Sequence, residues 1–108
     1  MTYATALTAL ADPTRRRVFE QLRGGPKTVG AIAARLPVSR PAVSQHLKVL
    51  RDAGLVAERP DGTRRVHFID PNGLGPLRAW LDQFWVQALA AFQAEVDADS
   101  KNRKEKQP

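Results

Sequence analysis

The side chains best suited to chemistry lie together in the stretch from Val38 to Leu50. Ser39 and Pro41 are typical of a helix start, because a serine hydroxyl caps free N–H groups and a first-turn proline has none to lose. An apolar stripe at helical spacing then faces a core, and it consists of Val43, Leu47 and Leu50. The other side, its flanks and the helix start carry the candidate contact residues, which are Ser39, Arg40, Pro41, Ser44, Gln45, Lys48 and Arg51.

Ser, Gln, Lys and Arg are the residue types that hydrogen-bond base edges and phosphates. Gln45 is the preferred adenine contact, because a carboxamide pairs with N6 and N7 of that base. Arg40, at the helix start, can bind guanine or hold a phosphate. Pro41 is interpreted as shaping the first turn, with a thymine methyl contact as the alternative. The other interpretation of the whole stretch is an ordinary amphipathic helix with a solvated outer face.

The segments before this helix favour the first interpretation. Residues 3–10 are predicted to be helical, and Asp12-Pro13 predicts the start of a second helix. Thr28 caps a short third helix whose apolar residues recur at i, i+3, i+4 and i+7. Leu36-Pro37-Val38 is a tight turn, and the Ser39 helix then runs to the glycine cap at Ala53-Gly54. Two short helices joined in this way form a helix-turn-helix pattern, in which the second helix enters the DNA major groove.

A β-hairpin is expected directly after this pair of helices. Residues 55–59 and 64–69 are predicted strands, and residues 60–63 form the turn with Gly62 available for positive φ. Val66 and Phe68 are expected to face inward, and His67 is expected to be exposed. The tip carries Arg59, Arg64 and Arg65, which predict a wing on the DNA backbone or minor groove. The alternative is a solvated hairpin edge, where cations block strand pairing.

A final helix is predicted over about residues 74–96, with a wide apolar surface that one small domain has little room to bury. Such surface usually marks a partner interface. The residues assigned to it are Leu77, Trp80, Leu81, Phe84, Trp85, Ala88 and Phe92. An effector pocket lined by the aromatic residues is the alternative. Residues 1–97 are therefore expected to form one domain, and residues 98–108 a disordered basic tail.

Charge and composition narrow the choice of partner. The 108 residues carry a formal net charge of +6, and residues 35–67 hold seven Lys or Arg against three Asp or Glu. Such a surplus favours a nucleic acid. With no cysteine and only His46 and His67, we expect no cofactor, no metal site and no thiol chemistry. No nucleophile–base pair or phosphate-binding glycine loop predicts an enzyme. No signal peptide or membrane span is expected, so the default location is the cytoplasm.

Taken together, these segments resemble the ArsR/SmtB family of bacterial winged helix-turn-helix repressors. The resemblance rests on residues 10–16, on Ser39 to Leu50, on Ala53-Gly54-Leu55-Val56 and on the wing, and it covers about residues 5–95. It implies a mainly α fold of five helices with a small β-hairpin, and a homodimer built on the first and last helices, to which Leu7 would contribute. It also implies the fourth helix in the major groove of double-stranded DNA.

The departures from the family pattern also carry information. Metal-sensing members have Cys near the recognition helix or Asp/His clusters on the last helix, and this chain has neither. It is similar to the Cys-free branch whose last helix carries Leu-Asp-x-Phe-Trp, here Leu81 to Trp85. That branch is generally without a known inducer, so the effector is left open.

The expected function is a sequence-specific transcriptional regulator, a repressor by analogy, that binds an inverted-repeat operator as a homodimer. One rival is a protein-interaction module that docks through its Trp-rich last helix and uses its charge for solubility. An RNA-binding protein is a second rival, although the usual aromatic stacking platform is missing. An enzyme is the least favoured class.

Overall fold

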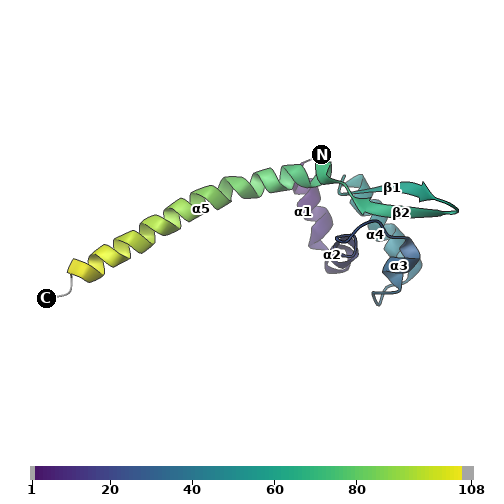
Figure 1. Ribbon diagram of the computed structural model, residues 1–108, viewed down its shortest axis with the longest axis horizontal. Helices are drawn as coiled ribbons and strands as arrows, with labels where there is room; N and C mark the ends of the chain where they lie inside the picture. Colours follow the sequence, from purple (N-terminus) through teal and green to yellow (C-terminus); the bar gives the residue numbers. More distant parts are fainter. Residues whose placement is uncertain (1, 106–108) are drawn as a thin grey trace. The chain divides into compact units, whose positions relative to one another are not determined.

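The computed structural model describes residues 2–105 and contains five helices and one antiparallel hairpin over that range (Figure 1). This confirms the fold class expected from the sequence. The elements are α1 (Tyr3–Ala11), α2 (Pro13–Glu20), α3 (Val29–Ala33), α4 (Arg40–Asp52), β1 (Val56–Asp61), β2 (Arg64–Ile69) and α5 (Pro71–Glu105).

Three helices begin at the predicted capping residues. The Asp12 carboxylate accepts a hydrogen bond from the backbone N–H of Arg15 at 2.9 Å, and this bond lowers the pKa of the Asp12 carboxyl below 3.8. The hydroxyls of Thr28 and Ser39 cap α3 and α4 in the same way, at 3.1 and 3.3 Å. Each cap satisfies an N–H group that the helix leaves unpaired, so the starts of α2, α3 and α4 are fixed locally.

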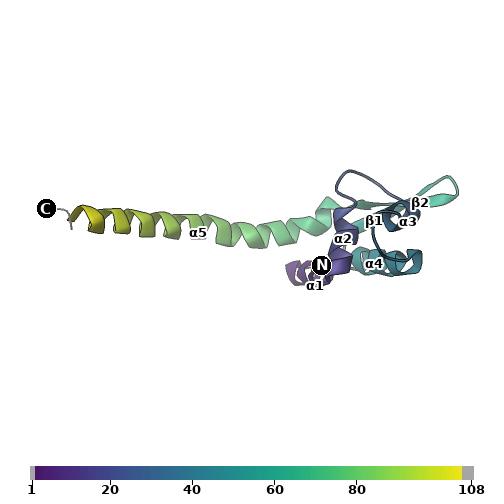
Figure 2. The same cartoon turned by 90° about the horizontal axis from the view of Figure 1, so that it is seen from below.

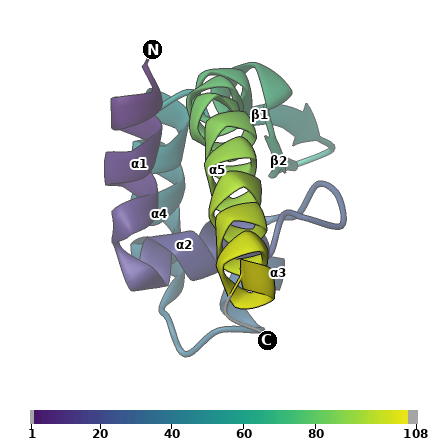
Figure 3. The same cartoon turned by 90° about the vertical axis from the view of Figure 1, so that its left-hand side faces the viewer.

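The core lies between α1, α2, α3, α4 and the base of the hairpin. Figure 3 shows α2 lying crosswise to α1 and α4. Val18 of α2, Ile32 of α3 and Leu47 of α4 are completely buried. The rest of the buried cluster consists of Ala6, Ala9, Leu22, Val43, Leu50, Ala53, Leu55 and Val56. Because both helices of the pair bury their apolar stripes here, the polar side of α4 is left at the surface.

The hairpin is tighter than predicted. Asp61 pairs with Arg64, so the strands continue to a two-residue loop of Gly62 and Thr63 instead of ending at a loop over residues 60–63. Gly62 has a φ of 63° and no non-glycine residue of the described chain has positive φ, which is the type II′ pattern. The hairpin tip projects beyond α3 and α4 (Figures 1 and 2).

The prediction that His67 is exposed is wrong. Its exposed fraction is 4%. Side chains alternate along a strand, so His67 shares a face with Ile69, which packs against the helical core, while Val66 and Phe68 point to the other face. Both faces are covered at the base of the hairpin, since Val66 is also buried.

Helix α5 is longer than predicted at both ends. It begins at Pro71 and continues to Glu105, so the expectation of disorder is wrong for residues 98–105. Side-chain pairs at i, i+4 spacing support the added turns: Gln93 donates to Asp97 at 3.0 Å, and Arg103 lies 3.3 Å from Asp99. Residues 106–108 of the predicted tail lie outside the described residues.

The chain divides into two compact units between Leu77 and Arg78, so α5 begins in one unit and continues as the other. The prediction of a single domain over residues 1–97 stays a prediction. Within the described residues, no helix has the length and apolar character that crossing a membrane requires.

The first turn of α5 packs closely on the connection between α4 and β1. A Cβ atom added to Gly73 would lie 1.8 Å from the carbonyl oxygen of Gly54. The backbone N–H of Asp70 also donates to the carbonyl of Leu55 at 3.0 Å. Only glycine fits at position 73, and this contact fixes the start of α5 against the helix pair.

Candidate nucleic-acid interface

The outer side of α4 has the composition that the sequence predicted. Pro41, Ser44, Gln45 and Lys48 are all exposed. At 100° per residue they lie on the side opposite the buried stripe of α4. The structure therefore presents two hydrogen-bonding side chains and one cation together on a helix that its other face holds rigidly.

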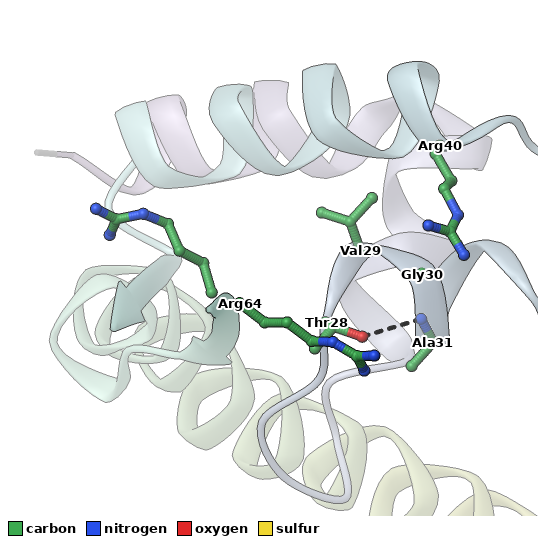
Figure 4. Close-up of a pocket in the computed structure, with 7 residues that line it drawn as sticks. Thr28, Val29, Gly30, Ala31, Arg40 and Arg64 are labelled. Carbon is green, nitrogen blue, oxygen red and sulfur yellow. Dashed lines mark hydrogen bonds between the residues drawn. The ribbon is translucent and has the colours of Figure 1, made fainter. Parts of the chain in front are cut away.

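Arg40 connects this helix to the wing. Arg40, Arg64 and Arg65 line one pocket of about 460 Å³, together with Thr28 to Ala31 at the start of α3. Figure 4 shows Arg40 and Arg64 on two sides of the Thr28–Ala31 turn. A Cβ atom on Gly30 would lie 3.1 Å from Nη2 of Arg40, so the glycine leaves room for the guanidinium to lie against α3. Three cationic residues from α4 and β2 thus line one concave site, with the guanidinium of Arg65 lying beside Glu58.

All three cations of the wing, which are Arg59, Arg64 and Arg65, are exposed. The Arg65 side chain is 62% exposed, and its Nη1 lies 3.6 Å from Oε1 of Glu58. A pair this exposed is weak, so Arg65 can exchange its carboxylate for another anion at little cost.

Two predicted site residues have structural partners of their own. The Ser39 hydroxyl caps α4, as described above. Arg51 is half-buried, and its Nη1 lies 3.1 Å from Nε2 of His67 and 3.6 Å from Oε2 of Glu58. Arg51 is therefore directed toward the base of the wing and is not grouped with the exposed side of α4.

Sequence reasoning missed Glu58 and His67 as parts of this site. His67 Nε2 lies 3.1 Å from Oε2 of Glu58, and the two residues are directly paired across the hairpin. Alternation along β2 gave no signal for them, because the set of Val66 and Phe68 and the set of His67 and Ile69 both contain apolar residues. His46 is half-buried on α4. Among the described residues, no group of three or more His, Cys, Asp or Glu is arranged to hold a metal ion.

The predicted partner surface lies mainly on α5. Phe84, Trp85 and Phe92 are 55%, 65% and 69% exposed. Leu81 and Ala88 are exposed beside them, and Trp80 packs edge-on against Phe84 with ring centroids 5.1 Å apart. Leu7 of α1 is exposed too, whereas Leu77 is half-buried against the core. We refer to Leu81, Phe84, Trp85, Ala88 and Phe92 as the α5 stripe.

Comparison with known proteins gives consistent matches. A family model described as a helix-turn-helix domain matches residues 10–59. The HTH-type transcriptional regulator Rv2034 of Mycobacterium tuberculosis is 57% identical over 91 residues, which cover 84% of this chain and 85% of the relative. The transcriptional repressor SdpR of Bacillus subtilis is 39% identical over 76 residues, which cover 70% and 84% of the two chains.

Solved structures agree with these sequence matches. The ArsR family transcriptional regulator RHA00566 is 32% identical with a TM-score of 0.68, over 82% of this chain and 94% of that one. The homodimeric winged helix-turn-helix DNA-binding domain of Mb0332 from Mycobacterium bovis is 29% identical with a TM-score of 0.61. That match covers 85% of this chain and 81% of the other.

Proposed function

This chain belongs to the ArsR family of winged helix-turn-helix transcriptional regulators, and we propose that it is a homodimeric repressor that binds an inverted-repeat DNA operator. The proposal rests on one observation: Arg40 of α4 and Arg64 and Arg65 of the wing line the same pocket. This arrangement makes the exposed side of α4 and the hairpin into one cationic surface.

In this proposal α4 lies in the major groove. Gln45 reads a base edge, with adenine as the preferred partner, and Ser44 and Lys48 contact bases or phosphates. Pro41 shapes the first turn and lies against the groove wall. Ser39 and Arg51 support this surface without contacting DNA directly, because Ser39 caps α4 and Arg51 links α4 to the wing through Glu58.

The pocket at the start of α3 would receive the DNA backbone. A phosphate there would lie among the guanidinium groups of Arg40, Arg64 and Arg65, and arginine binds phosphate through paired N–H donors. Arg59 extends the positive charge of the wing along β1. These contacts fix the position of the protein on the duplex and carry little sequence information.

The α5 stripe and Leu7 would form the dimer interface. An apolar surface of this kind is costly in water, and a second copy of the same chain covers it symmetrically. A two-fold dimer places its two α4 helices on half-sites one helical turn, about 34 Å, apart, so the operator is an inverted repeat.

The proposed activity is binding alone. The relatives are transcriptional regulators, and the proposal includes no catalytic step, metal or cofactor and assigns no small-molecule effector. Its site of action is chromosomal DNA in the cytoplasm.

The salt dependence of DNA binding tests the wing contribution. We expect Arg64→Ala to weaken binding to any duplex and to reduce the slope of log Kd against log salt by about one per protomer, since one phosphate contact is lost. Arg78→Ala is the matched control, because Arg78 is an exposed arginine on α5 outside the helix pair and the wing. The measurement is fluorescence anisotropy on a labelled duplex. Equal slopes for both variants would contradict the proposed interface.

A further inference from the structure

Arg51, Glu58 and His67 form a polar cluster at the base of the wing, and each comes from a different element. Arg51 lies in the last turn of α4, Glu58 on β1 and His67 on β2. Oε2 of Glu58 is 3.1 Å from His67 Nε2 and 3.6 Å from Arg51 Nη1, while its Oε1 is 3.6 Å from Arg65 Nη1. One carboxylate therefore faces the recognition helix, the opposite strand and a wing cation at once.

The burial of His67 fixes its protonation state. Its Nδ1 is buried and has no hydrogen-bond partner among the described residues. A buried N–H without an acceptor costs more than a buried lone pair, so the ring carries its single proton on Nε2 and donates it to Glu58. Arg51 has donors only, so it is joined to this ring through the Glu58 carboxylate that both side chains face. Burial lowers the pKa of His67 below 6.5, and Arg51 and Arg65 lower it further, against the opposing effect of the Glu58 carboxylate. These three side chains are the charged groups that act on the ring.

The backbone of His67 ties the wing to the other helix of the pair. Its carbonyl accepts from the N–H of Lys27 at 3.0 Å, and its N–H donates to the carbonyl of Lys27 at 2.8 Å. Lys27 lies directly before the α3 cap, Thr28. His67 thus connects β2 to the start of α3 through its backbone, and its side chain reaches Arg51 of α4 through the Glu58 carboxylate.

A two-stranded hairpin has little stability of its own, so its direction must come from contacts at its base. We propose that Glu58 and His67 are positioning residues that, through Arg51, set the angle of the wing to α4, so that Arg64 reaches the DNA backbone while α4 occupies the major groove. This inference rests on the proposed function and adds to it a mechanism for coupling its two DNA-contacting elements.

Removing the charge of Glu58 distinguishes this positioning role from simple repulsion of DNA, because the two roles change DNA affinity in opposite directions. Removing an acidic charge near DNA should tighten binding if the residue only repels phosphate. Asp61 is the matched control, because it is the other acidic residue of β1 and is exposed at the hairpin end. We expect Asp61→Asn to tighten binding to a labelled duplex and Glu58→Gln to weaken it. Tightening by both variants would overturn the proposal.

A double-mutant cycle then asks whether the wing still reaches the DNA. In the unmodified chain Arg64→Ala should weaken binding, whereas in the Glu58→Gln background it should cost about fivefold less, a coupling of about 1 kcal/mol. An unchanged cost of Arg64→Ala would overturn the positioning role. No cost of Arg64→Ala in the unmodified chain would instead refute the proposed wing contact itself, so the two failures are distinguishable.

Two further measurements distinguish a specific change in the Arg51, Glu58 and His67 cluster from general unfolding of a variant. Arg51→Lys keeps the charge but not the forked guanidinium, and it should reduce the cost of Arg64→Ala in the same direction. The ¹⁵N chemical shifts of the His67 ring should show the Nε2-protonated neutral form in the unmodified chain and a weakened Nε2–H bond in Glu58→Gln. A ring protonated on Nδ1 at neutral pH would contradict the hydrogen-bond pattern on which the proposal depends.

Discussion

Replacing Trp85 by alanine tests the proposed dimer interface. A tryptophan presents up to about 250 Å². Trp85 is 65% exposed, so about 160 Å² is open in one protomer. Complete coverage would be worth about 4 kcal/mol at about 25 cal/mol per Å², and coverage of half that area about 2 kcal/mol. Both copies contribute to a two-fold interface, so we expect about 4 kcal/mol and a roughly thousandfold rise in the dimer Kd.

Sedimentation equilibrium over a range of protein concentrations measures this change. Val86→Ala is the matched control, because Val86 is equally exposed, at 66%, and lies next to Trp85 in the same helix. At 100° per residue Val86 projects about 140° from Leu81, away from the α5 stripe. Its replacement should leave the dimer Kd within a few fold. An unchanged Kd for Trp85→Ala, or equal weakening by both variants, would refute the assignment of the α5 stripe to the interface.

Three other predictions concern packing, pH and base recognition. Gly73→Ala should cost about 2 kcal/mol or more in urea unfolding, because its Cβ meets a backbone carbonyl, whereas Gly75→Ala, whose Cβ meets only the neighbouring Pro76, should cost clearly less; the opposite order would contradict the close packing. The lowered pKa of His67 means that the unfolded chain binds a proton that the folded chain does not, so the free energy of unfolding should fall as the pH falls below 6.5, and His67→Gln should remove this slope; a flat profile for the unmodified chain would argue against the buried neutral ring. Gln45→Ala should narrow the difference in affinity between operator and random DNA, while Lys48→Ala should weaken binding to both alike; equal losses on both duplexes for Gln45→Ala would remove that residue from base recognition.

The parts of the fold that depend on local chemistry could be predicted from the sequence. The caps at Asp12, Thr28 and Ser39 each join a side chain to an N–H three residues later, and such contacts are set by neighbouring residues alone. The buried stripe of α4 follows from helical spacing in the same way. The exposed side of α4 was therefore predictable without knowledge of the rest of the chain.

The contacts that join the wing to the helices could not be predicted in this way. Alternation in β2 places either Val66 and Phe68 or His67 and Ile69 toward the core, and both sets contain apolar residues. The choice is made by the pairing of Ile69 with Val56 and by their packing on the helices. The roles of Arg51 and Glu58 depend on this choice, so neither was visible from local patterns.

The end of α5 was missed because the apolar periodicity stops before the helix does. Past Val96 the helix is maintained by residues with moderate or good helix propensity and by i, i+4 pairs such as Asp99 with Arg103. Hydrophobic spacing reports packing against a partner and carries no information about turns that face water.

The most direct test of the central claim is a selection of bound duplexes from a random pool, at about 150 mM salt, with purified protein of known oligomeric state. The account predicts recovery of an inverted repeat whose half-sites are centred one helical turn, about 10 base pairs, apart. It also predicts that Gln45→Ala recovers the same spacing with a relaxed base preference within each half-site. Recovery of no motif from a folded dimer would contradict sequence-specific DNA binding by this chain and would favour the α5 stripe as a docking surface for another protein.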